Sequence, residues 1–418
     1  MQQYSRTLIF GLNYPPETTG ISPYTGAMAS GLAGRGHEVR VVVAHPHYPE
    51  WTIAAGYGQW SKRENIDGVI VRRLLHFVPG RPSPLPRALS EVTFGLRQMC
   101  ARWGRPTAIV AVSPALLSTA LVRARALITH RRVPFVVWVQ DLYGLGVVET
   151  GQGGGAAARA IRAVERWLLR SAAIVVVIHD RFADRIHDDF GVSRERIRVV
   201  RNWTHLPPMP KADVDSVRST HGWGADETVV VHAGNMGVKQ GLEHVVDAGR
   251  LAHRSGEKIR FILVGNGSQR EALQRRVSME PTTTQLVPPL DPAAFADILQ
   301  AADVLLVNEL PGVSEMAVPS KLTSYFASGR PVLAATDEAG TTSQEVLAAQ
   351  AGLVVPAGDP ASILQGVKQL AADPEEAARL GTNGRRYKET VLKESFAIDR
   401  FDSLLADLTA TAAAKHPA

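Results

Sequence analysis

Short continuous apolar runs alternate with longer segments of helical periodicity along almost the whole chain. In the first half, the apolar runs predict strands near 6–12, 38–44, 69–75, 108–112, 134–140, 173–179 and 197–201. In the second half, they predict strands near 228–232, 259–264, 285–287, 303–307, 331–335 and 353–355. This alternation is typical of parallel βα units. We therefore expect an α/β protein with one doubly wound sheet in each half.

A proline-rich break separates the two halves. Residues 206–211 contain three prolines, and a polar stretch follows them. A chain of 418 residues also exceeds what one hydrophobic core usually supports. We expect a first domain at 1–205, a linker at 206–227, a second domain at 228–390 and a helical segment at 391–418 that packs back on the first domain.

The composition is that of a folded protein without a membrane span. Hydrophobic residues make up 45% of the chain and charged residues 21%, and no stretch approaches 18 uninterrupted apolar residues. The first residues lack the pattern of a signal peptide, so we expect a cytoplasmic protein. The lone Cys100 excludes an intramolecular disulfide and a multi-cysteine metal site.

The net charge of +6 is unevenly distributed. Residues 1–205 hold 26 lysines and arginines against 14 acids, whereas the remainder holds 20 against 26. Between Arg72 and Arg132 there are 11 arginines and one acid, Glu91. Such a concentration of arginine favours phosphate or anionic lipid as a partner, and a solvated basic face without a partner is the alternative.

Ligands of open α/β sheets bind at the carboxyl ends of the strands, so loops that follow strands are candidate sites. Gly20 and Ser22 follow the first strand and would let a phosphate approach a helix start. This loop is not G-x-G-x-x-G, so a nicotinamide dinucleotide site has little support. A glycine that serves only the turn is the alternative.

The loops of the second half suit a diphosphate better. The run Gly234-Asn235-Met236-Gly237-Val238-Lys239 offers a charge partner in Lys239 and a neutral donor in Asn235. The turn Gly265-Asn266-Gly267 also permits close approach of the backbone, and main-chain groups from Val287 onward could pair with a flat base. The alternative for Lys239 is a solvent-facing lysine in a βα turn.

Residues 314–332 predict a loop that opens directly onto a helix between two buried strands. Ser320 is a plausible N-cap after Pro319, and Lys321 stands in the first helical turn. Free N–H groups and the positive end of the helix dipole would face an anion there. A capped connector helix without a ligand is the alternative.

The order and spacing of these segments resemble the retaining glycosyltransferases of family 4. The likeness runs over essentially the whole chain, and the motifs Tyr14-Pro15-Pro16-Glu17 and Val318-Pro319-Ser320-Lys321 resemble especially the bacterial subgroup that builds capsular, colanic-acid and O-antigen polysaccharides. The resemblance implies the GT-B architecture, in which two Rossmann-like domains face each other across a cleft. It also implies a nucleoside diphosphate sugar bound by the second domain and an acceptor bound by the first.

The resemblance assigns roles residue by residue. A basic residue at the place of Lys239 meets the diphosphate, and the segment at Val287 holds the base. Family members usually carry two glutamates before the G-x-P-V turn, for the donor sugar and the ribose, but this chain has Met316 and Ser324 there. Glu315 or Glu309 could take over the sugar, and Ser324 could still bind ribose. A basic residue usual at Asn235 is missing, which shifts the charge to Lys239 and Lys321.

The first domain offers candidate acceptor residues. Asp141 ends a buried strand and would face the cleft, although an N-cap role is equally open. His45, His47, Tyr48 and Trp51 follow the second strand and are expected to shape the acceptor pocket, but two histidines in one loop do not define a metal site.

An amphipathic helix is expected near 84–105. Apolar residues recur there at helical spacing, while Arg87 and Arg97 take other positions and Trp103 lies near one end. Such a helix could lie on an anionic membrane, with these three residues facing the lipid. The alternative is that its apolar stripe packs into the core.

The leading hypothesis is a peripherally membrane-associated, retaining, metal-independent glycosyltransferase at the inner face of the cell membrane. Its donor would be a nucleoside diphosphate sugar, with a UDP-sugar favoured, and its acceptor a hydroxyl of a lipid-linked or small molecule. The candidate catalytic residues are Lys239, Glu315 and Asp141. No cofactor and no nucleic acid partner are expected. A nucleotide-sugar epimerase of the same fold and a non-catalytic binding protein are the alternatives.

Overall fold

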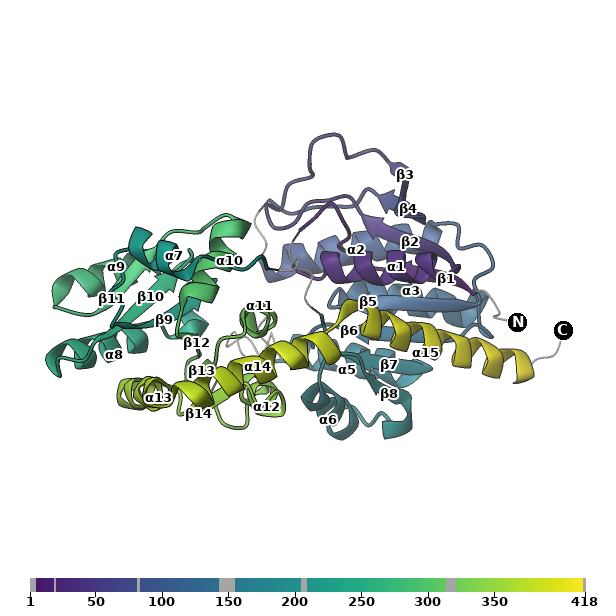
Figure 1. The fold of residues 1–418 in the computed structure, drawn as a ribbon. Helices are drawn as coiled ribbons and strands as arrows, with labels where there is room; N and C mark the ends of the chain where they lie inside the picture. The colour runs from purple at the N-terminus through teal and green to yellow at the C-terminus, as the bar shows by residue number, and fades with distance from the viewer. Residues whose placement is uncertain are drawn as a thin grey trace. The chain divides into compact units, whose positions relative to one another are not determined.

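The computed structural model describes residues 5–18, 20–80, 83–142, 155–203, 209–312 and 321–415. The chain divides into two compact α/β units, each built on its own sheet (Figure 1). One unit comprises Met1–His205 together with Glu394–Ala418, and the other comprises Leu206–Lys393. The predicted α/β class with two doubly wound sheets is confirmed.

The sheet of the first unit has the order β3-β4-β2-β1-β5-β6-β7-β8. Its strands are β1 (Arg6–Phe10), β2 (Glu38–Ala44), β3 (Ser61–Ile66), β4 (Val69–Leu74), β5 (Ala108–Ser113), β6 (Phe135–Val139), β7 (Ile174–Val177) and β8 (Ile197–Val199). All neighbouring strands are parallel except β3 and β4, which pair antiparallel. The strands β1, β5 and β6 are buried on both faces, which explains their continuous apolar runs.

The edge strand β3 was missed from the sequence. Its residues Ser-Lys-Arg-Glu-Asn-Ile are mostly polar and alternate between exposed and half-buried positions. A strand at the edge of a sheet buries little apolar surface, and charged side chains protect it from pairing with other chains. The hydrophobic pattern therefore carries no signal for it.

The helices of the first unit lie on both faces of its sheet. They are α1 (Ser22–Gly34), α2 (Pro84–Cys100), α3 (Leu116–Thr129), α5 (Ala156–Ser171), α6 (Asp180–Asp188), the 3₁₀ turn η1 (Arg194–Arg196) and α15 (Glu394–Lys415). Helix α1 begins with Pro23 at its second position, which is compatible with a helix start because proline there loses no intrahelical hydrogen bond.

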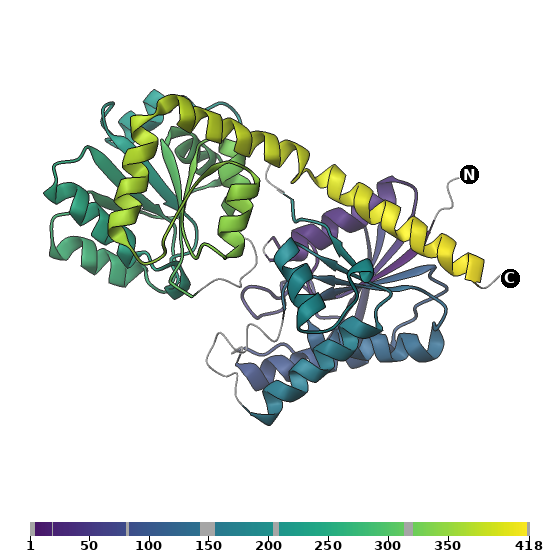
Figure 2. The same ribbon diagram turned by 90° about the horizontal axis from the view of Figure 1, so that it is seen from below.

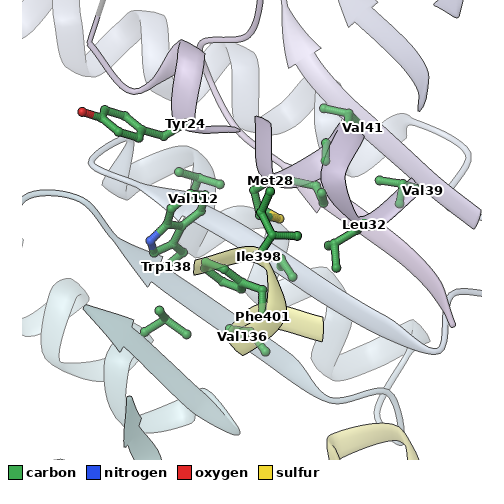
Figure 3. Close-up of a cluster of buried hydrophobic side chains, with 14 of the residues drawn as sticks. Tyr24, Met28, Leu32, Val39, Val41, Val112, Val136, Trp138, Ile398 and Phe401 are labelled. Carbon is green, nitrogen blue, oxygen red and sulfur yellow. The ribbon is translucent and has the colours of Figure 1, made fainter. Parts of the chain in front are cut away.

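Helix α15 returns to the first unit and completes its core. Ile398 and Phe401 pack among residues of α1 and the sheet, including Met28 and Trp138 (Figure 3). The Phe401 and Trp138 ring centroids are 4.8 Å apart. Gly31 of α1 permits this approach, because a Cβ there would lie 2.3 Å from Ile398 Cδ1.

Polar contacts fix the same helix at the surface. Arg35 pairs with Asp399, and His37 Nε2 lies 2.7 Å from an oxygen of Asp402. Arg400 donates to the Val199 carbonyl at 2.9 Å. The C-terminal helix is therefore an integral layer of the first unit.

The second unit contains a six-stranded parallel sheet in the order β11-β10-β9-β12-β13-β14. Its strands are β9 (Thr228–Ala233), β10 (Ile259–Val264), β11 (Thr284–Val287), β12 (Val304–Asn308), β13 (Val332–Ala335) and β14 (Gly352–Val355). Its helices are α7 (Val214–Thr220), η2 (Val238–Gln240), α8 (Glu243–Arg254), α9 (Arg270–Met279), α10 (Pro292–Ala301), α11 (Lys321–Ser328), α12 (Thr341–Ala348), α13 (Pro360–Ala372) and α14 (Pro374–Thr390).

Two hydrophobic cores cover the opposite faces of this sheet. Val229 and Val231 of β9 belong to one core, and the intervening Val230 belongs to the other. Helices accordingly lie on both faces (Figure 2). Residues 209–227, for which the sequence predicted a linker, contain α7 and contribute Val214 and Val217 to the first of these cores.

Candidate active site

The carboxyl ends of β9 and β10 are joined through three glycines. Gly234, Gly265 and Gly267 have positive φ angles of 135°, 136° and 156°. A Cβ on Gly265 would lie 2.0 Å from the Gly234 carbonyl oxygen, so the two turns pack backbone against backbone. The turns are also bonded directly, since Met236 N donates to the Asn266 carbonyl at 2.8 Å. Asn235 and Asn266 remain exposed beside this junction.

Lys239 lies in the short 3₁₀ turn η2 that follows these glycines. The turn is tied to the end of β12, because Asn308 Nδ2 donates to the carbonyls of Gln240 and Gly241 at 2.7 and 3.0 Å. Leu310 N donates to the Lys239 carbonyl at 2.9 Å. The backbone of Lys239 is thereby held at the carboxyl edge of the sheet, where the sequence placed it.

Lys321 begins helix α11 and brings a partly buried ammonium to the same edge. Its Nζ lies 3.2 Å from His232 Nε2, near the end of β9. A Cβ on Gly234 would lie 3.6 Å from both Cε and Nζ of Lys321, so the ammonium rests against the glycine turn. Burial lowers the pKa of Lys321 from 10.5 to about 8, against a smaller raising effect of the Glu309 carboxylate.

Glu309 directly follows β12, and its charge acts on Lys321. Burial raises the pKa of its carboxyl, whereas a hydrogen bond from Thr342 and the charge of Lys321 act to lower it. Thr342 Oγ1 donates to Glu309 Oε1 at 2.7 Å, and Glu309 N donates to the Ala335 carbonyl at 3.0 Å. Glu309 is thus held at the carboxyl edge of the sheet, and its role toward the donor sugar remains a prediction.

Helix α11 is anchored by Tyr325, one turn after Lys321. The Tyr325 hydroxyl accepts from Ala233 N at 2.8 Å and lies 3.3 Å from the Leu306 carbonyl. Ser324, expected to bind ribose, is buried on the same helix. Glu315, Pro319 and Ser320 lie outside the described residues, so their predicted roles remain predictions.

Two residues at this edge were not singled out for the site from the sequence. One is His232, which is fully buried and contacts Lys321. Arg270 in the first turn of α9 donates to the carbonyls of Gly265 and Val287 at 2.6 and 3.1 Å. The Val287 carbonyl also accepts from Gly265 N at 3.0 Å, so this predicted base-binding group is already engaged in joining two strand ends. The sequence signal that could have indicated Arg270 as a site residue is its position as a basic residue just after the glycine turn.

In the first unit, Glu17 brings the candidate acceptor loops together. Its Oε1 accepts from the backbone N–H groups of His47 and Tyr48 at 2.8 and 2.9 Å. Its Oε2 accepts from Tyr14 N at 3.2 Å. The carboxylate is buried, so these bonds fix the loop after β2 against the loop after β1.

The loop after β2 carries an aromatic cluster. The Trp51 ring lies 5.9 Å from His47 and 6.3 Å from Tyr48. A Cβ on Gly20 would lie 3.7 Å from the Tyr48 ring, so Gly20 joins this cluster. His45 is buried and its Nε2 contacts the Gln59 carbonyl at 2.8 Å.

His76, which follows β4, extends the cluster and was missed from the sequence. Its ring lies 5.2 Å from that of His47. Burial, reinforced by the nearby His47 and His45, lowers its pKa to about 3. Among the described residues, no three His, Cys, Asp or Glu side chains are placed to share a metal ion.

Asp141 follows β6 and is exposed. The preceding Gln140 exchanges two hydrogen bonds with Asn202, at 3.2 and 2.8 Å, which fixes the end of β6 against the segment after β8. Asp141 therefore stands at the carboxyl edge of the first sheet. The structure places Asp141 and the histidine loop on the first unit, and Lys239 and Lys321 on the second.

Helix α2 presents its apolar stripe to solvent. Leu85, Leu89 and Leu96 are 83%, 52% and 51% exposed. The buried face holds polar residues, including Glu91, whose carboxylate accepts from Leu117 N at 2.9 Å. The alternative in which this stripe packs into the core is therefore wrong.

Trp103 does not face outward as predicted. It is 2% exposed, its ring lies 4.7 Å from that of Phe10, and its Nε1 donates to the Gln98 carbonyl at 3.0 Å. The chain leaves the helix at Cys100 and turns the indole into the core. Trp60, which is 69% exposed, instead lies beside α2, with the Arg97 guanidinium 3.4 Å from its ring centroid.

Two models of known protein families match this chain, one in each half. One, described as "Glycosyl transferase 4-like domain", matches residues 19–203, and the other, described as "Glycosyl transferases group 1", matches residues 227–373. The relative named "Putative colanic acid biosynthesis glycosyl transferase WcaI", from Escherichia coli K12, is 30% identical over 413 residues, covering 95% of this chain and 98% of the relative. The chain therefore belongs to the family-4-like glycosyltransferases, as its motifs indicated.

Solved structures share the whole fold. Sucrose-phosphate synthase from Thermosynechococcus elongatus superposes with a TM-score of 0.71 at 19% identity, covering 97% of this chain and 100% of that one. Anabaena HepE, solved in complex with UDP, superposes with a TM-score of 0.68 at 14% identity, covering 96% and 100%. The predicted GT-B fold is confirmed. In the described parts of the chain, no helix has the length and apolar character needed to cross a bilayer.

Proposed function

We propose that this glycosyltransferase moves a sugar from a nucleoside diphosphate sugar to a hydroxyl of a lipid-linked glycan, with retention of the anomeric configuration. The observation that carries the proposal is the ammonium of Lys321. It lies partly buried against the Gly234 turn, at the edge of a parallel sheet where ligands of such folds bind. A cation kept in this position at the expense of its hydration suits an anionic ligand.

The chemistry follows from the charge that develops on the leaving diphosphate. Lys321 and Lys239 stand at the same sheet edge and would neutralise this charge as the glycosidic bond breaks. In a partly desolvated site, fixed cations stabilise such a charge more strongly than water does. The leaving diphosphate would accept the proton of a hydroxyl that attacks from the same face, which accounts for retention without a separate base.

A UDP-sugar is the favoured donor. The Anabaena HepE structures, solved with UDP and with UDP-glucose, support this choice through the common fold. The acceptor would be bound by the first unit, where His47, His76 and Trp51 form the aromatic cluster. The relative assigned to colanic acid biosynthesis supports a surface polysaccharide as the product.

We further propose that α2 attaches the enzyme to an anionic membrane. The surface formed by Leu85, Leu89, Leu96 and Trp60, hereafter the α2 surface, combines exposed apolar side chains with Arg97 and the exposed Arg87. Leucine side chains would enter the interface while the guanidinium groups meet lipid phosphates. This attachment would deliver the enzyme to a lipid-linked acceptor.

Incubation of the purified chain with radiolabelled UDP-sugars and a bacterial lipid extract tests the transfer. Label in the lipid fraction supports the proposal. An isomerised free donor would instead indicate an epimerase, and nucleotide binding without turnover would indicate a binding protein. Thermal-shift screening with UDP, GDP, ADP and TDP identifies the base.

Co-sedimentation with vesicles tests the α2 surface separately. The natural chain should sediment with phosphatidylglycerol vesicles and less with phosphatidylcholine. The variant Leu89→Gln/Leu96→Gln should lose most of this binding, while the equally exposed Leu347→Gln on α12 should not. Equal binding of all three proteins would exclude α2 as the attachment site.

A further inference from the structure

His232 is a fully buried imidazole whose two nitrogens contact two different elements. It is the penultimate residue of β9. Its Nδ1 lies 3.1 Å from the Leu306 carbonyl on the neighbouring strand β12. Its Nε2 lies 3.2 Å from the Nζ of Lys321 on α11. The ring therefore connects the centre of the sheet to the lysine at its edge.

The hydrogen-bond network assigns the tautomer of this ring. The Leu306 carbonyl, 3.1 Å from Nδ1, only accepts, so the hydrogen of the neutral ring belongs on Nδ1; the backbone of Asn235 also contacts the ring. The Nε2 lone pair then accepts from Lys321, because an ammonium only donates. Burial and the charge of Lys321 both lower the pKa of His232, which keeps the ring neutral.

The contact with the His232 ring restricts the side chain of Lys321, which would otherwise adopt several rotamers. A lysine has four rotatable bonds, and fixing them costs about 2 kcal/mol of conformational free energy when it happens on ligand binding. One of the three N–H bonds of the Lys321 ammonium donates to His232, and the Gly234 turn lies directly against the ammonium. Among the described residues no other group accepts from this ammonium, so its remaining N–H bonds can serve a ligand at that turn.

The surroundings of the ammonium favour an anionic ligand. Lys321 stands in the first turn of α11, where its charge adds unfavourably to the positive end of the helix dipole. Among the described residues, no carboxylate oxygen forms an ion pair with it within 4 Å, and Glu309 acts only from farther away. Among the described residues, the titratable groups that act on Lys321 are therefore His232 from β9 and Glu309 after β12.

We propose that His232 is a positioning residue of the donor site: its Nε2 holds the Lys321 ammonium at the Gly234 turn, oriented toward the diphosphate of the nucleotide sugar. This inference rests on the proposed function, since it presupposes a diphosphate at that turn. His232 itself does not touch the substrate. Its contribution is that the cation is already in place when the donor binds.

Two substitutions separate this role from a purely structural one. In His232→Gln, the longer side chain brings an amide oxygen to the place of Nε2, so it can still accept from Lys321. In His232→Asn, the shorter amide reaches the place of Nδ1 and can donate to the Leu306 carbonyl, but it falls short of the lysine. A positioning role predicts that Gln retains function and Asn loses it. A structural role toward Leu306 predicts the reverse order.

The measurement is the dissociation constant of the full chain for UDP, by calorimetry between pH 6.5 and 9.5. At pH 7.5 we expect Asn to weaken binding about tenfold, the equivalent of one charge-assisted hydrogen bond, and Gln to stay within about threefold of the natural chain. Without its acceptor the ammonium is less stabilised, so the loss of affinity on the alkaline side should begin at lower pH in Asn than in the natural chain. Equal losses in both variants, or an unchanged pH profile in Asn, would overturn the proposal.

The same experiment separates this inference from the proposed function. If the natural chain binds none of the four nucleoside diphosphates, the proposed function fails. If it binds UDP and both variants bind equally well, only the role of His232 fails. If the Asn variant is too unstable to purify, ¹⁵N-histidine NMR of the natural chain replaces it, with the His232 signals assigned by comparison with the Gln variant. We expect a neutral ring with its hydrogen on Nδ1. A hydrogen on Nε2 would overturn the proposal.

Discussion

Replacing Lys321 by methionine tests the donor site most directly, because the change removes the charge and keeps most of the side-chain volume. Two opposing effects on the free energy of unfolding can be worked from the structure. Burial lowers the pKa of Lys321 from 10.5 to about 8, so the charged form is disfavoured by roughly 3 kcal/mol at most, and partial exposure reduces this to about 1–3 kcal/mol. Methionine removes that cost.

The second effect has the opposite sign. Without the ammonium, the buried Nε2 of His232 loses its donor, which costs about 1–3 kcal/mol. The two effects are of similar size, so we expect Lys321→Met to change the free energy of unfolding by less than about 2 kcal/mol near pH 7. A loss of activity in this variant will therefore not be explained by unfolding.

The pH dependence of stability provides an internal check. The pKa of Lys321 is lower in the folded than in the unfolded chain, so its unfavourable contribution is complete below about pH 8 and disappears as the pH rises toward 10.5. The natural chain should gain stability relative to Lys321→Met between these values. Urea titrations at pH 7, 8, 9 and 10 measure the difference.

The effect on activity should be much larger. Loss of one fixed donor to a developing charge typically costs about 10²–10³-fold in kcat, and we expect a decrease of this order in kcat/KM for the nucleotide sugar. Release of the nucleoside diphosphate, measured in a coupled assay, follows the reaction. The control is Lys258→Met, which removes an exposed lysine paired with Asp226 just before β10. If Lys321→Met stays within threefold of this control, Lys321 does not serve the diphosphate.

Further predictions concern the first unit and the cation of the donor site. Phe401→Ala should lower the free energy of unfolding by about 3–5 kcal/mol, because the ring is fully buried against Trp138, while the exposed Asp407→Ala should have little effect; denaturant titration compares them. Glu17→Gln should raise the KM for the acceptor several-fold and leave UDP affinity unchanged, because it weakens the bonds that fix the loop after β2; an equal loss of UDP affinity would contradict this. Relative to Glu91→Gln, the natural chain should lose stability as the pH rises from 4.5 through 7, because burial raises the pKa of Glu91 to about 7; thermal melts of the two proteins across this range measure the difference. If Lys239 and Lys321 neutralise the charge of the diphosphate, sugar transfer should persist in EDTA. An activity that is lost in EDTA and restored by Mg²⁺ would refute this.

The amphipathic helix shows where a sequence pattern is ambiguous. Helical periodicity places Leu85, Leu89 and Leu96 on one face but does not say which face meets the protein. In the structure the opposite face is buried, since Glu91 accepts from Leu117 N and Gln98 Nε2 donates to the Val42 carbonyl at 3.4 Å. This inner face combines the fully buried Phe94 with polar side chains whose hydrogen bonds offset part of the cost of their burial.

The alternation of apolar runs and helical segments by itself determined the α/β class, two sheets and most of their strands. This worked because central parallel strands are buried on both faces and must be apolar throughout. It failed for β3, whose place at the sheet edge requires no apolar residues. The order of the glycine turns along the chain also indicated the family. These turns are visible in the sequence because their local backbone conformation requires glycine.

Only the tertiary structure decided how the donor edge is assembled. His232 and Lys321 are 89 positions apart, and nothing in the local sequence of either predicts their contact. Parallel strand order brings β9 next to β12 and places α11 over their ends, which makes a buried strand histidine the partner of a helix lysine. Long-range pairings of this kind arise from the packing of whole elements, and a residue pattern read along the chain does not contain them.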